Sequence, residues 1–362
     1  MRNGRRMVFV GPGRPLECHE SEVASPAPGG LVVRTTIAGV CGTDAHRLDG
    51  DLPDPGRPVT FGHEGIGVVE ELGAGVTADL AGVALRVGDT VYWSPSSREP
   101  GIPSELGWPP PAELANPAAY QDYATLPPSN MVYRVPDDTD AEAVIAFGCA
   151  MPTALGGMAR LGGVRPGHSV VVQGSGPVGL AATFLAGLTA ARQVIVIGAP
   201  DNRLVAAARL GASTTIPLER TTVEERRASI LDLTDGRGAD VVIEAAGRMN
   251  AFDEGMNLLA DNGRYVVLGI YSGHGQVALD AVRLNNRNLS VIGSMGGTQL
   301  SDYRTTIYLA QRHGARLGFA ELITHRFGLT DLEDAIAVAR AGDAIKAIVL
   351  PALDPHAAAP AS

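Results

Sequence analysis

The chain has 362 residues, of which 45% are hydrophobic and 5% aromatic, and it is long for a single core, so we expect an α/β protein of two lobes. Its formal net charge is −10 without a basic cluster, so we expect a small-molecule substrate and neither nucleic acid nor an anionic membrane as partner. Three widely separated cysteines indicate thiols in a reducing cytoplasm, and no apolar run is long enough for a membrane span or a signal peptide.

The first part of the chain reads as β-rich. We expect a strand at 31–38, a polar loop or short helix at 40–49, a glycine-spaced β segment from residue 59, and a strand at 87–93. Nine prolines without periodicity then lie between 94 and 128. This composition predicts a surface lobe that is separate from the core.

The sequence pattern changes from residue 140 onwards. Residues 140–161 look helical, with Cys149 inside the helix and Pro152 interrupting it, and we place a domain boundary there. Beyond it, apolar strands alternate with helical patterns, which indicates a doubly wound parallel sheet. The expected strands are 170–172, 194–197, 241–244, 265–268 and 289–292.

The end of the chain is expected to return to the first domain through a helix at 332–341 and a strand at 347–350. Residues 354–362 read as a frayed tail. The predicted domains are therefore 1–151 with 295–362, and 152–294.

The turn after the strand at 170–172 carries Gly174, Gly176 and Gly179 in G-x-G-x-x-G spacing. The first glycine permits the tight bend, the second lets the backbone approach a pyrophosphate, and the third lets the next helix pack closely on the sheet. A dinucleotide would bind at the N-terminus of that helix. The surrounding βαβ unit favours this interpretation over an ordinary glycine turn.

A catalytic zinc needs three protein ligands and one open position. Cys41, His63 and Cys149 could supply the ligands. Their wide spacing in the sequence leaves open whether they converge.

Four motifs in order give the chain a family resemblance. They are Cys-Gly-Thr-Asp-Ala-His at 41–46, Gly-His-Glu-Gly-Ile-Gly at 62–67, Gly-Asp-Thr-Val at 88–91 and the glycine turn at 174–179. Together they resemble the zinc-dependent alcohol dehydrogenases of the medium-chain dehydrogenase/reductase superfamily, over residues 31–351. The resemblance implies a GroES-like β-rich catalytic domain and a Rossmann cofactor domain.

The resemblance also implies roles for single residues. Cys41, His63 and Cys149 would bind the zinc, with Glu64 beside it as an alternative ligand and Asp44 orienting His63. Thr43 would accept the proton of the reacting alcohol and pass it through a ribose hydroxyl to His46. The remaining predicted site residues are Thr153, Val178 and Lys346 at the cofactor, and Trp93, Ser94 and Pro95 in the substrate pocket.

The implied activity is hydride transfer between a secondary alcohol or polyol, or its ketone, and a nicotinamide cofactor. Asp201 comes three residues later than the usual carboxylate after the second strand of the cofactor domain, which leaves open whether it reaches the ribose, and Arg203 could meet the 2′-phosphate of NADP. Because no basic pair directly follows the strand, we expect NAD over NADP. No cysteine lies at 94–116, where many relatives hold a structural zinc, so we expect one zinc per chain.

Two other functions remain open. A zinc-free reductase of quinones or enoyl compounds would not need the cysteine and histidine ligands. A non-catalytic protein would not need Thr43 and His46.

By analogy with relatives, a homodimer or homotetramer is expected to form through the outer strand at 289–292.

Overall fold

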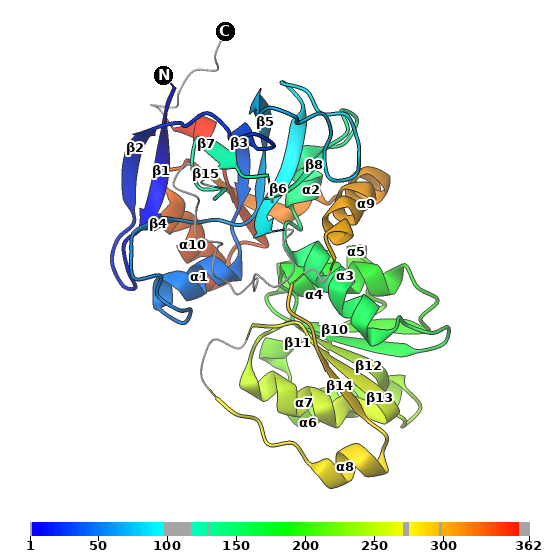
Figure 1. The fold of residues 1–362 in the computed structure, drawn as a ribbon. Coiled ribbons are helices and arrows are strands. Elements are labelled where there is room, and N and C mark those ends of the chain that lie inside the picture. Colours follow the sequence, from blue (N-terminus) through cyan, green and yellow to red (C-terminus); the bar gives the residue numbers. More distant parts are fainter. Residues whose placement is uncertain (1, 98–116, 129, 271–274, 297–298, 355–362) are drawn as a thin grey trace. The chain divides into compact units, whose positions relative to one another are not determined.

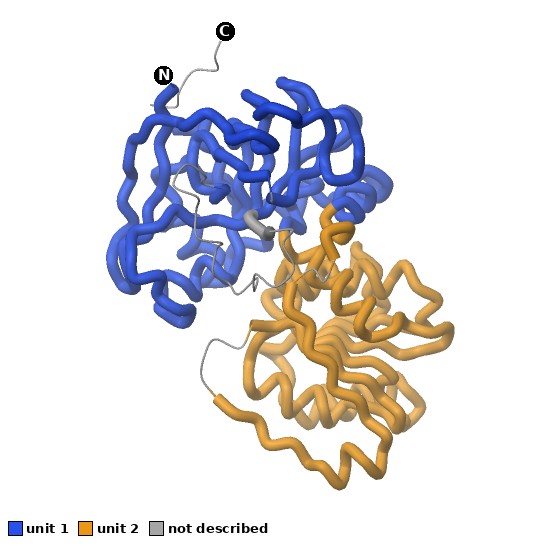
Figure 2. Tube along the Cα trace, viewed as in Figure 1, with its two compact units in different colours: residues 1–148, 304–362 blue, residues 149–303 orange. Residues whose placement is uncertain are grey.

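The computed structural model describes residues 2–97, 117–128, 130–270, 275–296 and 299–354 (Figure 1). The chain divides into two compact units, coloured in Figure 2. Unit 1 comprises Met1–Gly148 and Arg304–Ser362, and unit 2 comprises Cys149–Tyr303. The domain ends predicted at 151 and 294 differ from these by three and nine residues. The described residues contain no helix that is both long and apolar enough to cross a membrane.

Unit 1 is built mainly of antiparallel strands. In the described residues, β2, β1 and β4 form one small sheet, and a larger sheet has the order β15-β16-β3-β5-β6-β8, with β7 also paired to β3. The elements are β1 (Asn3–Phe9), β2 (Glu17–Glu22), β3 (Leu31–Gly39), α1 (Gly42–Asp49), β4 (Val59–Thr60), β5 (Gly65–Leu72), β6 (Thr90–Ser97), β7 (Tyr123–Leu126), β8 (Asn130–Arg134), α2 (Ala141–Ile145), α9 (Ser301–Leu317, which begins in unit 2), η2 (Ala320–Leu322), β15 (Ile323–Phe327), α10 (Leu332–Ala341), β16 (Lys346–Val349) and η3 (Pro351–Leu353).

Strand β3 lies in the core of unit 1, since seven of its nine residues are buried and it pairs with β16, β5 and β7. Trp93, Phe61, Tyr120 and Phe9 are among the largest side chains that are completely buried. Helix α10 and strand β16 pack into the same unit, as the prediction that the chain end returns to the first domain requires.

Two predictions about unit 1 are wrong. The stretch at 94–128 is not wholly a surface lobe, because Ala118–Tyr120 are completely buried and the four residues of β7 lie in the core. Residues 98–116, including Trp108, lie outside the described residues. Asp354 is not part of a frayed tail, since it is 6% exposed and bonds Arg5 and Thr330. The rest of that tail, 355–362, also lies outside the description.

Unit 2 is a parallel sheet in the order β11-β10-β9-β12-β13-β14, which confirms the predicted doubly wound class. Strand β9 is buried on both faces, as its continuous apolar run requires. The elements are α3 (Ala150–Leu161), β9 (Ser169–Gln173), α4 (Pro177–Gly187), β10 (Gln193–Gly198), α5 (Asp201–Arg209), β11 (Thr214–Pro217), η1 (Leu218–Arg220), α6 (Val223–Leu233), β12 (Ala239–Glu244), α7 (Met249–Leu258), β13 (Leu259–Val267), α8 (Ala281–Asn286) and β14 (Ser290–Gly293).

The helix predicted at 140–161 is two helices, α2 and α3. The interruption comes before Pro152 and not at it. Pro152 lies in the first turn of α3, where its missing N–H would have had no partner within the helix. Cys149 is the N-cap residue of α3 and lies outside the helical interior.

The glycine turn has the spatial requirements that its motif predicts. A Cβ on Gly179 would lie 1.9 Å from the carbonyl oxygen of Gly174, and one on Gly174 would lie 2.9 Å from Ala245 backbone. A Cβ on Gly176, at the N-cap of α4, would meet nothing within 4 Å. The first and third glycines are therefore required by packing, and the open space at the second leaves room for a ligand.

Candidate metal centre

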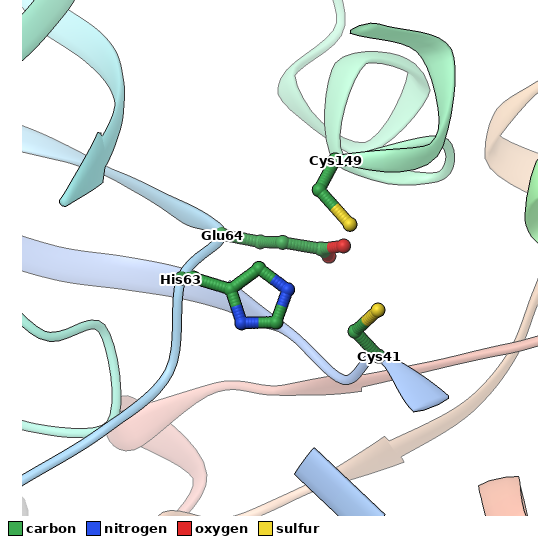
Figure 3. Close-up of side chains that lie close together, drawn as sticks. All are labelled: Cys41, His63, Glu64 and Cys149. Atoms are coloured by element: carbon green, nitrogen blue, oxygen red, sulfur yellow. The ribbon is translucent and has the colours of Figure 1, made fainter. Parts of the chain in front are cut away.

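Four side chains gather where the resemblance predicted a metal. One ligand atom from each of Cys41, His63, Glu64 and Cys149 lies within 4.8 Å of all the others, and the side chains converge on one point (Figure 3). Two sulfurs, one imidazole nitrogen and one carboxylate oxygen are the donors that zinc accepts in proteins. The donor set therefore fits a zinc ion.

The local backbone explains how each ligand is aimed. Cys41 is the N-cap of α1, and its backbone N–H donates to Asp44 Oδ2 at 2.9 Å, which closes a capping box. His63 and Cys149 each follow a glycine with positive φ, Gly62 at +97° and Gly148 at +41°. Side chains are disfavoured at both glycines because Tyr120 lies where a Cβ on Gly62 would be, and Glu64 lies where one on Gly148 would be.

Asp44 lies behind His63. Its Oδ1 is 3.6 Å from His63 Nδ1, which leaves Nε2 as the ring nitrogen available to a metal. Burial by itself lowers the pKa of His63, but Asp44 and the Cys41 thiol outweigh it and raise that pKa well above its usual value. The imidazole is thus held in a strongly anionic environment, which attracts a divalent cation as well as a proton.

Glu64 is paired with the single lysine of the chain. Lys346 Nζ donates to Glu64 Oε2 at 2.5 Å and to the Val40 carbonyl at 3.0 Å. Both side chains are almost completely buried, at 1% exposure for Glu64 and 3% for Lys346. The ammonium that was predicted to contact the cofactor pyrophosphate is therefore engaged with Glu64, and the cofactor contact stays a prediction.

The two residues predicted to move protons lie on α1. Thr43 Oγ1 accepts from the Cys41 thiol at 3.6 Å, so its hydroxyl is next to the group of ligands. His46 Nδ1 is 2.9 Å from Asp51 Oδ2, and its side chain is 30% exposed. This exposure lets the imidazole exchange protons with water.

Most of the predicted cofactor residues of unit 2 follow the carboxyl ends of β9 and β10, whereas Thr153 lies in α3. Val178 is in the first turn of α4, and Thr153 in α3 donates its hydroxyl to the Cys149 carbonyl at 2.9 Å. Asp201 begins α5 and accepts two bonds from Arg220, at 2.7 and 2.8 Å. Arg203 lies in the same turn, and its backbone N–H donates to the Pro200 carbonyl. None of these positions tests the cofactor assignment, which stays a prediction.

The predicted pocket residues lie on β6. Trp93 is completely buried, its indole N–H donates to the Pro117 carbonyl at 2.9 Å, and its ring fills the space beside Gly65. Ser94 is 3% exposed, and its carbonyl accepts from Asn130. Pro95 follows in the same strand. Their contact with substrate stays a prediction.

Sequence reasoning missed two buried polar residues in this region. Tyr120 donates its hydroxyl to the Asp44 carboxylate at 2.7 Å, and burial followed by the charge of Asp44 raises its pKa well above the usual value. Arg47 is 6% exposed on α1, and burial lowers its pKa. A tyrosine in a proline-rich stretch gives no sequence signal for such a contact, whereas Arg47, directly after the motif at 41–46, could have been noticed.

Known proteins resemble both halves of the chain. Residues 27–137 match the family model of the alcohol dehydrogenase GroES-like domain, and residues 177–312 match that of the zinc-binding dehydrogenases. The 5-exo-hydroxycamphor dehydrogenase of Pseudomonas putida is 39% identical over 359 residues, which are 96% of this chain and 99% of the relative. D-xylulose reductase A of Aspergillus niger is 30% identical and covers 89% of this chain and 89% of its own length.

Solved structures agree with these relatives. An alcohol dehydrogenase from Thermotoga maritima has a TM-score of 0.87 at 29% identity and covers 97% of this chain and 100% of its own. A protein from Sinorhizobium meliloti described as a zinc-binding dehydrogenase, solved with NADP, has a TM-score of 0.82 at 25% identity, with coverage of 97% and 100%.

A GroES-like unit with a cysteine, histidine and glutamate group, together with a Rossmann unit, defines a dehydrogenase of the two-domain type. The chain belongs to the zinc-dependent alcohol dehydrogenase family of the medium-chain dehydrogenase/reductase superfamily. The predicted family and fold class are confirmed, and so is the class of activity, an oxidoreductase of the alcohol dehydrogenase type.

Proposed function

We propose that the protein is a dehydrogenase with one catalytic zinc, held by Cys41, His63 and Cys149. The observation that carries the proposal is the gathering of these donor atoms, with Glu64, within 4.8 Å of one another. Glu64 is the alternative ligand, because Lys346 holds its carboxylate beside the group. The chain has only three cysteines and two of them are in this group, so a second site of four cysteines has no ligands.

Zinc, when bound, supplies a Lewis acid that lowers the pKa of an alcohol. The residues of the chain then handle the proton. The Thr43 hydroxyl lies beside the ligands and would accept the substrate's proton, because it can accept one hydrogen bond while donating another. His46 would release the proton to water, since its ring is partly exposed.

Metal content tests this proposal against the zinc-free reductase. Protein purified without added metal should hold about one zinc per chain and lose alcohol oxidation after treatment with a chelator. The double variant Cys41→Ser with Cys149→Ser should lose both the zinc and the activity, whereas Cys18→Ser should keep both because Cys18 is exposed on β2. A wild-type protein that is free of zinc and reduces enones or quinones would favour the reductase. A protein that binds zinc and cofactor and turns over none of these compounds would favour the non-catalytic alternative.

We propose an alicyclic secondary alcohol as the substrate class, with polyols as the second candidate. The support is the 39% identity, over almost the whole of both chains, to a dehydrogenase of hydroxycamphor, which is itself an alicyclic secondary alcohol. A panel of bicyclic alcohols, sugar alcohols and simple secondary alcohols tests the proposal through kcat/KM. A preference for sugar alcohols would overturn it in favour of a polyol dehydrogenase.

NAD is the proposed cofactor, and we expect the protein to bind it more tightly than NADP. Asp201 offers a carboxylate after β10, but it already accepts two bonds from the Arg220 guanidinium. Strand β10 itself ends in Gly198, where a Cβ would lie 2.3 Å from Ser175 Oγ and no acidic side chain fits. We expect Asp201→Asn to bind NADPH more tightly, because Arg220 then becomes available to a 2′-phosphate. Fluorescence titration with NADH and NADPH measures both affinities, and an unchanged ratio in this variant would contradict the assignment.

We also propose that the protein pairs through β14. This strand is the last in the order of its sheet, and Val291 on it is 37% exposed. An apolar strand at a sheet edge favours pairing with a second copy. Light scattering should show a dimer or a tetramer, and a Val291→Lys variant should shift the protein towards the monomer.

A further inference from the structure

Tyr120 contacts Asp44 next to the metal group, although nothing in the proposed mechanism uses it. Its side chain is completely buried in unit 1. Its phenol oxygen is 2.7 Å from Asp44 Oδ2 and 3.0 Å from the Gly39 carbonyl oxygen. A phenol has one proton for these two acceptors, and the carboxylate is both nearer and charged, so the bond to Asp44 is the stronger.

Asp44 connects Tyr120 to two of the ligands. Its Oδ2 accepts the Tyr120 O–H and the Cys41 N–H, while its Oδ1 faces His63 Nδ1 at 3.6 Å. The rotation of a carboxylate is fixed when one oxygen is held by two donors. The other oxygen then stays directed at the histidine.

The ring of Tyr120 packs against the residues just before His63. A Cβ on Gly62 would lie 2.8 Å from the Tyr120 ring, and the rings of Phe61 and Tyr120 are 5.0 Å apart in an edge-to-face arrangement. The Tyr120 backbone N–H also donates to the Phe61 carbonyl at 3.1 Å. The ring and the backbone of Tyr120 therefore act on the residues just before His63, whereas its hydroxyl acts on Asp44. A variant that lacks only the hydroxyl separates the two effects.

We propose that Tyr120 is a positioning residue for the metal centre, whose hydroxyl fixes the Asp44 carboxylate so that His63 presents Nε2 to the metal. This inference rests on the proposed zinc function. Groups that orient a metal-bound histidine typically contribute about 10-fold to 100-fold to metal affinity. Because Tyr120 acts on the histidine through Asp44, we expect an effect near the lower limit, about tenfold.

The variant Tyr120→Phe tests the inference, because it keeps the ring and removes only the hydroxyl. Cobalt(II) is the probe, and its affinity and visible absorption spectrum are measured on the full chain without cofactor or substrate. We expect cobalt to bind about tenfold more weakly. We also expect the absorption bands of the bound ion to shift, because the imidazole is no longer held in one orientation.

Tyr265→Phe is the matched control. Tyr265 is also completely buried, but its hydroxyl donates to Gln173 in unit 2, away from the ligand residues. This control should lose thermal stability to a similar extent and keep the cobalt affinity and spectrum of the wild type. Asp44→Asn supplies a second route. If Tyr120 acts through Asp44, adding Tyr120→Phe to Asp44→Asn should weaken cobalt binding less than Tyr120→Phe does in the wild type.

Each outcome has one meaning. Weaker cobalt binding and a shifted spectrum in Tyr120→Phe alone support the positioning role. Equal affinity and an unchanged spectrum in both tyrosine variants overturn it and leave the zinc proposal standing. A wild-type protein that binds neither cobalt nor zinc overturns the zinc proposal, and the role of Tyr120 with it.

Discussion

Replacement of Arg5 by methionine should destabilise unit 1 strongly, because Arg5 joins segments that are far apart in the sequence. Arg5 Nε and Nη2 donate to the two carboxylate oxygens of Asp122, Nη1 donates to Asp354 at 2.7 Å, and Nη2 also reaches the Pro351 carbonyl. The exposed fractions of Arg5, Asp122 and Asp354 are 8%, 5% and 6%. The variant would leave two buried carboxylates without the cation that both of them bind.

The size of this effect follows from burial. Removing one partner of a buried ion pair costs about 3–5 kcal/mol. Here the lower limit of about 3 kcal/mol is expected. The reason is that Asp122 keeps the Arg5 backbone N–H and Asp354 keeps the two donors of Thr330. In a unit of roughly 200 residues, each kcal/mol shifts Tm by about 2–4 °C, so Tm should fall by about 6–12 °C.

Tryptophan fluorescence during thermal unfolding measures this change, since the buried Trp93 belongs to unit 1. Arg2→Met is the control from the same end of the chain. Arg2 pairs with Glu70 at 3.4 Å and is about one third exposed, so its loss should cost at most about 1 kcal/mol. If the two variants unfold at the same temperature, the Arg5 network does not stabilise the unit as argued.

Two further predictions concern the site and the glycine turn. Lys346→Met should lower the Tm of unit 1 because it leaves the Glu64 carboxylate buried without its cation. Adding Glu64→Gln to this variant should restore part of the lost stability. A Lys346→Met variant as stable as the wild type would contradict a stabilising Lys346–Glu64 ion pair. Gly179→Ala should destabilise unit 2 because its Cβ would overlap the Gly174 carbonyl, whereas Gly176→Ala should keep the Tm and weaken NADH binding, as calorimetry and fluorescence titration would show. Equal stability of the two alanine variants would refute this separation.

The local features of the molecule were predictable from the order of its residues. Apolar runs of strand length predicted β9, β10, β12 and β13, because strands covered on both faces need no polar alternation. The glycine turn was predictable for a similar reason, since three glycines in fixed spacing have local steric requirements. Strand β11 was missed because its four residues, Thr-Thr-Ile-Pro, give too short a pattern.

The errors arose where composition was averaged over a window. Prolines dominate 94–128 and concealed β7, a buried strand of four residues that pairs with β3. The alanine-rich end of the chain likewise concealed Asp354, whose partner Arg5 is 349 residues away. A single sequence carries no signal for a contact between such distant positions, and neither residue belongs to a motif.

The metal group shows where the two sources of information divide. The sequence by itself determined the candidate ligands, because Cys41 and His63 lie in local motifs and Cys149 is one of only three cysteines. Only the tertiary structure decided what surrounds them, namely the Lys346 ammonium on Glu64 and the Tyr120 hydroxyl on Asp44. Lys346 is 282 residues from Glu64 in the sequence, and Tyr120 is 76 residues from Asp44. Burial selects these partners, since a charge or hydroxyl removed from water needs a hydrogen-bond partner among the groups that the fold brings near it.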